Sequence, residues 1–331
     1  MKNVLITGIT GQDGGYLAKL LLSKSYKVYG AQRRNTGKKH WRLDELNITD
    51  HINFVDIDLS EPYNIEKVID KVQPDEIYNL AAQSFVGLSF EQPQVTTISN
   101  SLGVLNILEV IRNKYSKIKF YQASTSEMFG KVTEIPQKET TRFYPRSPYG
   151  CAKAYSHYLT INYRESYNLF ACAGILFNHE SPLRGEEFVT RKTTKGLVEW
   201  MKTGKVLELG NLESYRDWGH AEDYVEAMWL MLQQDQPDDY VIATGKTIQI
   251  KDFIIKCLEE LNIKYEFKGH EVFDYKGNPI IKTNPKYFRP AEVDELIGDS
   301  AKAKEKLSWK PKHTLDTLVK EMISADLKRY K

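Results

Sequence analysis

The chain has few cysteines and no long apolar run. Its 331 residues include three cysteines, Cys151, Cys172 and Cys257. Because no two of them are close in sequence, we expect neither a disulfide framework nor a cysteine zinc site, and this usage is typical of a reducing compartment. The longest apolar runs, such as AMWLML, are far too short to cross a bilayer, so we predict no contact with a membrane.

An excess of charge of one sign is also missing. The 46 basic and 44 acidic residues nearly balance, which predicts no nucleic-acid partner and no polybasic membrane contact. No basic segment followed by a long apolar stretch stands at the start, so we expect no signal peptide and a cytoplasmic location. With 41% apolar residues, the chain can bury a sizeable core.

Strand and helix patterns alternate in the first half of the chain. Strand patterns cover 3–7, 27–31, 52–58, 76–81, 117–124 and 170–177. Helical patterns cover 14–26, 62–72, 95–114 and 149–167. This alternation predicts an α/β fold with a doubly wound, mostly parallel Rossmann sheet whose strands end along one edge.

The rhythm loosens after about residue 178. Short strands are expected at 207–211 and 240–244, and amphipathic helices at 300–311 and 314–330. We predict a nucleotide-binding domain over 1–178 with a returning segment at about 218–245. A smaller C-terminal, substrate-binding lobe is expected over 179–217 and 246–331.

A glycine triplet stands at the first strand–helix turn. The segment TGITGQDGGYL supplies Gly8, Gly11 and Gly14. Glycine lets the backbone approach a pyrophosphate, and a helix N-terminus offers free N–H groups. The triplet therefore predicts dinucleotide binding; the alternative is a tight turn that needs small residues.

Two arginines follow the second strand, where an acid normally holds the ribose 2′-hydroxyl of NAD. Arg33 and Arg34 stand there instead. Guanidinium groups suit a 2′-phosphate, so we predict NADP rather than NAD, with a solvated basic loop as the alternative.

Tyr149 and Lys153 lie four residues apart and so share one helix face. The segments YNIEK and YSKIK have the same spacing, so the position has to decide. Only Tyr149 opens a helix after the predicted fifth strand. Beside an ammonium and an oxidised nicotinamide, its pKa would fall from about 10, and the phenolate would accept a hydroxyl proton.

These features together resemble the extended short-chain dehydrogenase/reductase family. The resemblance rests on the glycine loop, NLAA at 79–82, Thr125 and the Tyr149–Lys153 pair, and it covers nearly the whole chain. It implies epimerisation, reduction, decarboxylation or dehydration, so one more residue has to separate these outcomes.

Glu127 in the segment QASTSEMFG is that residue. On an extended segment it would point the same way as Thr125. A sugar oxidised at C4 has an acidic C5 proton, and its removal lets the C6 hydroxyl leave as water. We predict that Glu127 is the base and then the acid in this step. A turn cap is the alternative, and UDP-glucuronate decarboxylases of the family have a similar Thr-Ser-Glu segment.

Longer segments narrow the resemblance. ILFNHESPLRGEEFVTRK, GNLESYRDWGHAEDYVEAMWLM and KYFRPAEVDELIGDSAKAKEKLSWKP are similar to those of the GDP-mannose 4,6-dehydratases. This implies a GDP-sugar as substrate, catalysis by Thr125, Glu127 and Tyr149 with Lys153 in support, and a homodimer or homotetramer. The implied cofactor contacts, besides Gly14, Tyr149 and Lys153, are Gly8, Ile9, Thr10, Gly11, Gln12, Asp13, Arg33, Arg34, Asn35, Thr36, Asp58, Leu59, Leu80, Ala81, Ala82, Gln83, Ser84, His179 and Arg184. The implied substrate contacts, besides the catalytic residues, are Ser84, Asn178, Val189, Lys192, Arg216, Arg289 and Glu292.

Three departures from the family leave alternatives open. The loop after Arg34 is short, Phe85 stands where a histidine is usual, and Val95 where a tyrosine is usual. The change at Phe85 leaves another GDP-sugar, such as a GDP-manno-heptose, open as the substrate. The other two departures leave open the tetramer and the choice of NADP over NAD. A non-catalytic NADP-binding regulator is a third possibility, against which the presence of Tyr149 and Glu127 counts.

The remaining histidines and tyrosines carry no clear ligand pattern. His40, His51, His157, His270 and His313 lack metal-ligand spacing, so we interpret them as surface or core residues and expect no metal. The tyrosines of the 149–167 helix are interpreted as core and subunit contacts.

Overall fold

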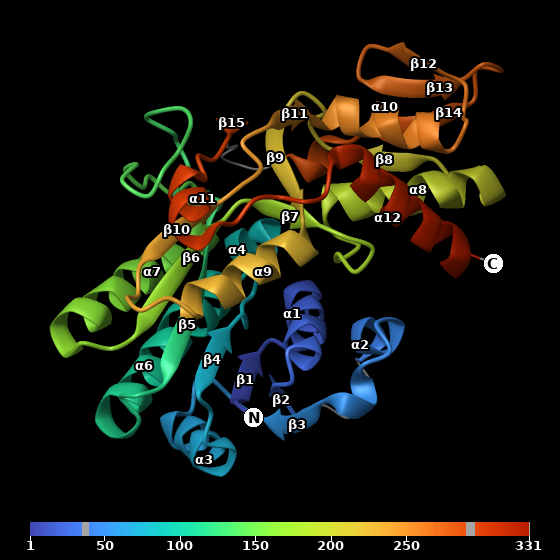
Figure 1. Cartoon of the computed structure of the whole chain (residues 1–331). Coiled ribbons are helices and arrows are strands. Elements are labelled where there is room, and N and C mark those ends of the chain that lie inside the picture. Colours follow the sequence, from blue (N-terminus) through green and yellow to red (C-terminus); the bar gives the residue numbers. More distant parts are fainter. Residues whose placement is uncertain (35–39, 289–294, 331) are drawn as a thin grey trace.

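The computed structural model describes residues 1–34, 40–288 and 295–330, and its largest feature is a seven-stranded sheet (Figure 1). The strands are β1 (Asn3–Thr7), β2 (Lys27–Gln32), β3 (Asn53–Asp56), β4 (Glu76–Asn79), β5 (Lys119–Thr125), β6 (Ala171–Leu176) and β10 (Asp239–Ile242). Their order is β10-β6-β5-β4-β1-β2-β3, and all neighbours are parallel. The predicted doubly wound α/β sheet is confirmed.

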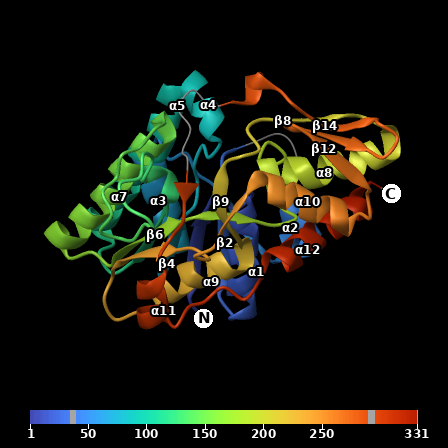
Figure 2. The same ribbon diagram turned by 90° about the horizontal axis from the view of Figure 1, so that it is seen from above.

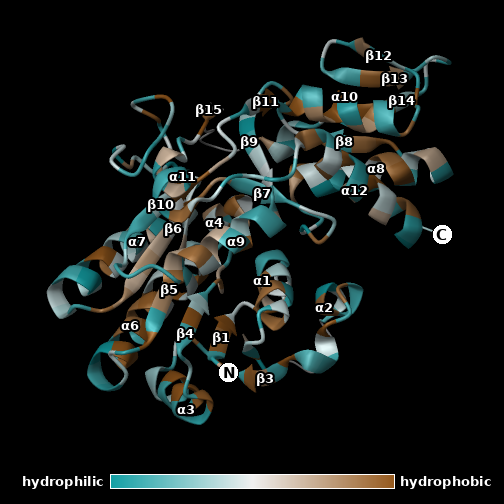
Figure 3. Cartoon of the chain, viewed as in Figure 1, coloured by the Kyte–Doolittle hydropathy of each residue, from teal (hydrophilic) through white to brown (hydrophobic). Residues whose placement is uncertain are grey.

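Helices cover both faces of this sheet, so apolar side chains of its strands are buried on both sides. In β1, Val4 and Ile6 join one apolar cluster and Leu5 joins the other. The first cluster includes residues of α1 (Gln12–Ser23), α9 (Ala221–Leu232) and α11 (Ala301–Leu307), and the second includes residues of α3 (Pro62–Val72), α6 (Gly103–Lys114) and α7 (Pro148–Tyr167). Each large apolar side chain buried in this way contributes about 2 kcal/mol. In Figure 3, α3 carries both hydrophobic and hydrophilic bands, as a helix with one buried face should.

The order of the strands reverses beside β1. The chain runs outward from β1 to β2 and β3, then crosses back to β4 and β5 on the other side. In open α/β sheets, a crevice forms at such a switch point, outside the carboxyl ends of the strands. The site is therefore expected where β1 and β4 end.

The second half of the chain adds a separate apolar cluster with short strands. This cluster joins α8 (Val189–Thr203), α10 (Ile250–Glu260) and α12 (Leu315–Arg329), which lie on one side of the molecule in Figure 2. One small sheet has the order β12-β13-β14-β8, from Tyr265–Lys268, Glu271–Asp274, Pro279–Thr283 and Leu207–Leu209. The other joins β7 (Asn178–Glu180), β9 (Tyr215–His220), β11 (Thr247–Gln249) and β15 (Glu295–Leu296).

Short helices complete the chain. They are α2 (Trp41–Glu45), α4 (Val86–Glu91) and α5 (Pro93–Thr97), with a π-helical turn at Ile98–Leu102 and 3-10 turns at Thr49–His51, Ser126–Met128 and Pro285–Tyr287. The helix predicted over 95–114 is thus a run from α5 to α6 that the π-helical turn interrupts. In the described part of the chain, no helix has the length and apolar character needed to cross a membrane.

Helix α11 packs against α9 and β10 of the large sheet, because Ala303 and Leu307 are buried in the first apolar cluster. The boundaries predicted at residues 178 and 246 stay a prediction.

Candidate functional site

A cavity of about 900 Å³ lies at the carboxyl ends of the central strands. The predicted residues that line it are Gly8, Thr10, Gly11, Gln12, Asp13, Gly14, Arg33, Leu59, Leu80, Ala81, Ala82, Gln83, Ser84, Thr125, Glu127, Tyr149, Lys153, Asn178, His179 and Arg184. Those that do not line it are Ile9, Arg34, Asp58, Val189, Lys192 and Arg216. Asn35, Thr36, Arg289 and Glu292 lie outside the described residues.

The glycine loop closes tightly between β1 and α1. Gly8 has a φ of +71°, and a Cβ there would lie 2.8 Å from the Ala81 nitrogen. A Cβ on Gly14 would lie 2.4 Å from the Gly8 oxygen. Gly11, the residue before α1, donates its N–H to that same Gly8 oxygen at 2.9 Å. Main chain rather than side chains therefore forms this wall, as a cradle for a pyrophosphate requires.

A buried polar row lies beneath the loop. The Thr7 hydroxyl donates to Asn79 Oδ1 at 2.6 Å, and Asn79 Nδ2 donates to Gln122 Oε1 at 2.8 Å. The Thr7 oxygen also accepts from the N–H groups of Leu80 and Ala81, both at 3.1 Å. These bonds tie the ends of β1, β4 and β5 together, so the cavity has a rigid floor.

Asp13 and His179 form an ion pair at one side of the cavity. Burial alone would raise the pKa of Asp13, but the His179 imidazole, 2.9 Å from Oδ2, lowers it to about 2. Burial acts against charge on His179, yet Asp13 keeps the pKa of this imidazole raised. The pair joins the start of α1 to β7 across the cavity.

Arg33 is the one of the two predicted phosphate-binding arginines that reaches the cavity. It donates to the Ser99 hydroxyl at 3.1 Å. Asp58 instead holds Ser60, accepting from its N–H at 2.9 Å and its hydroxyl at 2.7 Å. Its neighbour Leu59 lines the cavity.

The segment after β5 differs from the prediction in one respect. β5 ends at Thr125, and Glu127 lies in a 3-10 turn rather than on an extended segment. The alternation that we invoked therefore does not apply, although both residues line the same cavity. The Thr125 hydroxyl accepts the Glu127 N–H at 3.3 Å and so caps this turn.

Helix α7 brings Tyr149 and Lys153 to this turn. Pro148 occupies its first position, and the Ser147 hydroxyl caps it by accepting the Gly150 N–H at 3.0 Å. A Cβ on Gly150 would lie 2.8 Å from the main-chain oxygen of Glu127. The absence of a side chain at Gly150 thus lets the start of α7 pack directly against the segment with Glu127.

The pKa values of the pair differ from our expectation. Burial raises the pKa of Tyr149 to about 12; the Thr125 hydroxyl opposes this shift, and the charge of Glu127 adds to it. Burial also lowers the pKa of Lys153 to about 8, and its Nζ donates to the Ala123 oxygen at 2.8 Å. We expected the pKa of Tyr149 to fall beside two positive charges, those of Lys153 and of an oxidised nicotinamide. The groups of the protein alone do not lower this pKa.

Of the predicted nucleotide-sugar contacts that the structure describes, Ser84, Asn178 and the catalytic residues line this cavity, whereas Val189, Lys192 and Arg216 do not. Lys192, in the first turn of α8, places its Nζ 3.4 Å from the centre of the Tyr287 ring. Arg216 is buried in β9 and donates to the Tyr215 oxygen at 2.7 Å. Their role stays a prediction.

Among the residues of the cavity wall that sequence reasoning missed are His40 and Arg42. His40, which we interpreted as a surface or core residue, lies 2.9 Å from Gln32 Oε1 and stacks on Phe54 with ring centres 4.2 Å apart. Arg42 donates to two main-chain oxygens on opposite sides of the cavity, those of Thr10 and Leu183. No local pattern signals either role, because the partners are distant in sequence.

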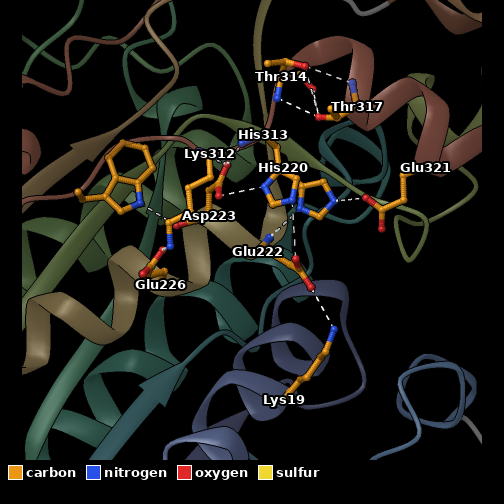
Figure 4. Close-up of polar contacts among 11 residues, drawn as sticks. Lys19, His220, Glu222, Asp223, Glu226, Lys312, His313, Thr314, Thr317 and Glu321 are labelled. Carbon is orange, nitrogen blue, oxygen red and sulfur yellow. Dashed lines mark hydrogen bonds and ion pairs between the residues drawn. The ribbon is translucent and has the colours of Figure 1, made fainter.

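A second polar cluster lies away from the cavity, where α9 meets α12 (Figure 4). Among the residues that the structure describes, His220, Glu222 and His313 offer ligand atoms within 4.8 Å of one another. However, the two imidazole rings stack with centres 4.1 Å apart. His220 Nδ1 accepts the Glu222 N–H at 3.1 Å, and its Nε2 lies 2.9 Å from Glu321. Stacked rings direct their lone pairs side by side rather than to one point, so this arrangement suits a junction between helices better than a metal ion.

Comparisons with known proteins agree over nearly the full length of the chain. A family model described as GDP-mannose 4,6 dehydratase matches residues 5–322. A GDP-mannose 4,6-dehydratase of Yersinia enterocolitica is 48% identical, covering 100% of this chain and 95% of the relative. The human GDP-mannose 4,6 dehydratase is also 48% identical, covering 98% and 91%.

Solved structures share the fold. A UDP-glucose 4-epimerase of Thermotoga maritima with UDP-glucose has a TM-score of 0.85 at 25% identity, covering 99% of this chain and 100% of its own. A dTDP-glucose 4,6-dehydratase of Bacillus anthracis in complex with NAD has a TM-score of 0.82 at 22% identity, covering 99% and 97%. RMD of Pseudomonas aeruginosa complexed with NADPH has a TM-score of 0.78 at 20% identity, covering 99% and 100%.

Proposed function

Because this chain belongs to the GDP-mannose 4,6-dehydratase family, we propose that it removes water from GDP-mannose to give GDP-4-keto-6-deoxymannose. The observation that carries the proposal is the set of Thr125, Glu127, Tyr149 and Lys153 on the wall of one cavity beside the glycine loop. The overall change is internal: C4 is oxidised from alcohol to ketone, C6 is reduced, and the C6 hydroxyl leaves as water.

The cavity fits a nicotinamide dinucleotide. Gly8 leaves no space for a Cβ, so the loop can meet a pyrophosphate with its main chain, and solved structures of the same fold are described with NAD or NADPH. When bound, the nicotinamide would supply the acceptor and then the donor of one hydride. We propose NADP rather than NAD, because Arg33 lines the cavity where an acid would select a free 2′-hydroxyl.

The chain's own groups would handle the protons. Tyr149 would accept the proton of the C4 hydroxyl, with the Thr125 hydroxyl at its side to orient both oxygens. Because burial raises the pKa of Tyr149 to about 12, this step requires additional positive charge beside the phenol. Lys153, with Nζ 5.9 Å from the ring centre and bound to the Ala123 oxygen, would supply part of that charge.

Glu127 would carry the elimination. Its carboxylate removes the C5 proton, which the C4 ketone has made acidic, and then delivers a proton to the C6 hydroxyl as it leaves as water. When C6 is reduced, C5 would take up a proton that comes from solvent, which replaces the one lost. General acid–base catalysis of this kind is worth about 10²–10⁴-fold. Glu127 is buried, so bulk water does not compete at that carboxylate.

A related sugar is the second candidate. Phe85 packs edge-on against Phe188 with ring centres 6.0 Å apart, and Phe188 lines the cavity. An aromatic wall near the sugar would accept a GDP-manno-heptose as well.

We also propose a homodimer or homotetramer, because α7 carries the exposed Tyr155 and Tyr158, and light scattering of the pure protein tests this.

Mass spectrometry of product mixtures tests the function. The purified chain, loaded with NADP, is incubated with GDP-mannose, a GDP-manno-heptose and UDP-glucuronate in parallel. We expect loss of one water from GDP-mannose. Loss of carbon dioxide from UDP-glucuronate would indicate a decarboxylase, and no conversion of any sugar would support the non-catalytic alternative.

A further inference from the structure

Two arginines hold the turn that follows β7. Arg42 of α2 donates from Nε to the Leu183 oxygen at 2.6 Å. Arg329, at the end of α12, donates from Nη2 to the Pro182 oxygen at 2.9 Å. Successive carbonyls of one turn are thus bound by guanidinium groups from opposite ends of the chain. This turn leads directly into Arg184, which lines the cavity.

Arg42 also reaches the other wall of the cavity. Its Nη1 donates to the Thr10 oxygen at 3.1 Å, within the glycine loop. The same two walls are joined a second time, because the Ser181 hydroxyl donates to Gln12 Oε1 at 2.8 Å. Arg42 therefore joins the glycine loop to the turn at 181–184 beside the cavity, and its planar fork meets both carbonyls at once.

Helix α2 has little else to hold it in place. It has five residues, and Leu43 is the one buried among them. Glu45 accepts from Arg329 Nε at 3.1 Å, and Trp41 lies against the guanidinium of Arg42, 4.5 Å from the ring centre. Leu43 anchors α2 in the first apolar cluster, and the two arginines tie its polar side to the glycine loop and to the C-terminal helix.

We propose that Arg42 is a positioning residue for the cofactor: its guanidinium fixes the glycine loop against the turn that carries Arg184, and Arg329 holds that turn from α12. This inference rests on the proposed cofactor site. It predicts that loss of the bridge leaves the two walls held by fewer contacts, those of Ser181 with Gln12 and of His179 with Asp13. The dinucleotide should then leave faster, while the groups around Glu127 and Tyr149 keep their arrangement.

The test measures the rate at which NADPH leaves, by nicotinamide fluorescence after dilution into excess unlabelled NADP. Arg42→Met loses two hydrogen bonds from a charged donor, so its dissociation rate should rise roughly tenfold or more. Arg42→Lys keeps the charge but not the fork, and it should behave more like Arg42→Met than like the parent protein. Added methylguanidinium should slow release from an Arg42→Ala protein, whereas methylammonium should not.

Arg164→Met is the matched control. Arg164 is also largely buried, donates to the Ala171 main-chain oxygen at 2.9 Å and pairs with Asp239 at 2.7 Å, but it does not line the cavity. Its loss should lower the unfolding temperature without changing NADPH release. An equal acceleration in Arg164→Met, or release from Arg42→Met at the parental rate, would overturn the inference.

Further variants distinguish a wrong assignment of Arg42 from a wrong assignment of the cofactor site. If Arg42→Met does not fold, Arg42→Lys and Arg329→Met carry the test, and Arg329→Met should accelerate release by a smaller factor. A parental protein that retains no NADPH at all would refute the proposed cofactor site and this inference with it. A parental protein that retains NADPH beside Arg42 variants that retain it equally would refute the bridge alone.

Discussion

The cofactor end of the site and the segments predicted to hold the nucleotide sugar are built in different ways. Around the glycine loop, the wall is main chain at the ends of parallel strands, tied by a buried polar row from Thr7 to Gln122. Lys192 and Arg216 instead stand on α8 and β9, among short mixed strands, and they do not line the cavity. The first end is set by the topology of the sheet, whereas the second depends on individual side chains.

Replacement of Gly8 by alanine should cause the largest effect, because it acts on the main-chain wall. The new Cβ would meet the Ala81 nitrogen at 2.8 Å in a backbone of positive φ. We expect the free energy of unfolding to fall by about 3 kcal/mol. Cofactor binding should no longer be measurable.

Gly204→Ala is the control for this change. Gly204 has nearly the same φ, +73°, but nothing lies within 4 Å of a Cβ there. Denaturant unfolding should show a loss of about 1 kcal/mol for this variant. Equal losses at the two positions would mean that the close approach at Gly8 is unimportant.

Arg33→Asp should have the next largest effect. An acid in place of the guanidinium would repel a 2′-phosphate, so the affinity for NADP should fall by about 10–100-fold while that for NAD changes little. Arg34→Asp makes the same change in charge at a neighbour that does not line the cavity, and it should have a smaller effect. Calorimetric titrations in which the parent prefers NAD would contradict the choice of NADP.

Lys192→Met tests the segments that are predicted to hold the nucleotide sugar. If the ammonium binds the nucleotide sugar, the KM for GDP-mannose should rise by about tenfold, with kcat and NADPH release nearly unchanged, since one charge-assisted contact is lost. Lys195→Met, three residues further along α8, should leave KM unaltered. A loss of NADPH retention in Lys192→Met would remove the distinction between the two ends.

The pH dependence of stability tests the burial of Lys153 in the absence of any ligand. Burial lowers the pKa of Lys153 from 10.5 to about 8, so between these values the unfolded chain binds more protons than the folded one. Stability of the cofactor-free protein relative to Lys153→Met should therefore rise with pH across this window, by at most about 1.4 kcal/mol per unit. Chemical unfolding at pH 8 and pH 10 provides the comparison, and an unchanged difference would place the lysine in a more polar environment.

Sequence patterns were most reliable where local and tertiary signals agree. The helix predicted over 62–72 is α3 with the same bounds, and the strand and helix flanking Glu127 are present. We did not predict β12, β13 or β14, because they are short and belong to no alternating βα pattern. The 3-10 turn at Glu127 escaped notice because Thr125 caps it through a contact that sequence spacing alone does not reveal.

The bridge made by Arg42 shows the other limit of sequence analysis. Its partners, Thr10 and Leu183, are far from it along the chain, and an arginine on a short polar helix is typical of solvent-exposed segments. Only the meeting of three distant elements gives the residue a role. Residues such as Gly8, whose role comes from the local turn, could be recognised directly.

A single turnover of Glu127→Gln with GDP-mannose in deuterated buffer tests the central claim most directly. The amide keeps the shape of the side chain but cannot take the C5 proton. We predict that the absorbance of the reduced nicotinamide appears and persists and that the 4-keto-hexose accumulates. The loss of water should slow by about 10²–10⁴-fold. The parent should place solvent deuterium at C5, and Tyr149→Phe should show no absorbance change. Dehydration by Glu127→Gln at the parental rate would contradict the role proposed for this glutamate.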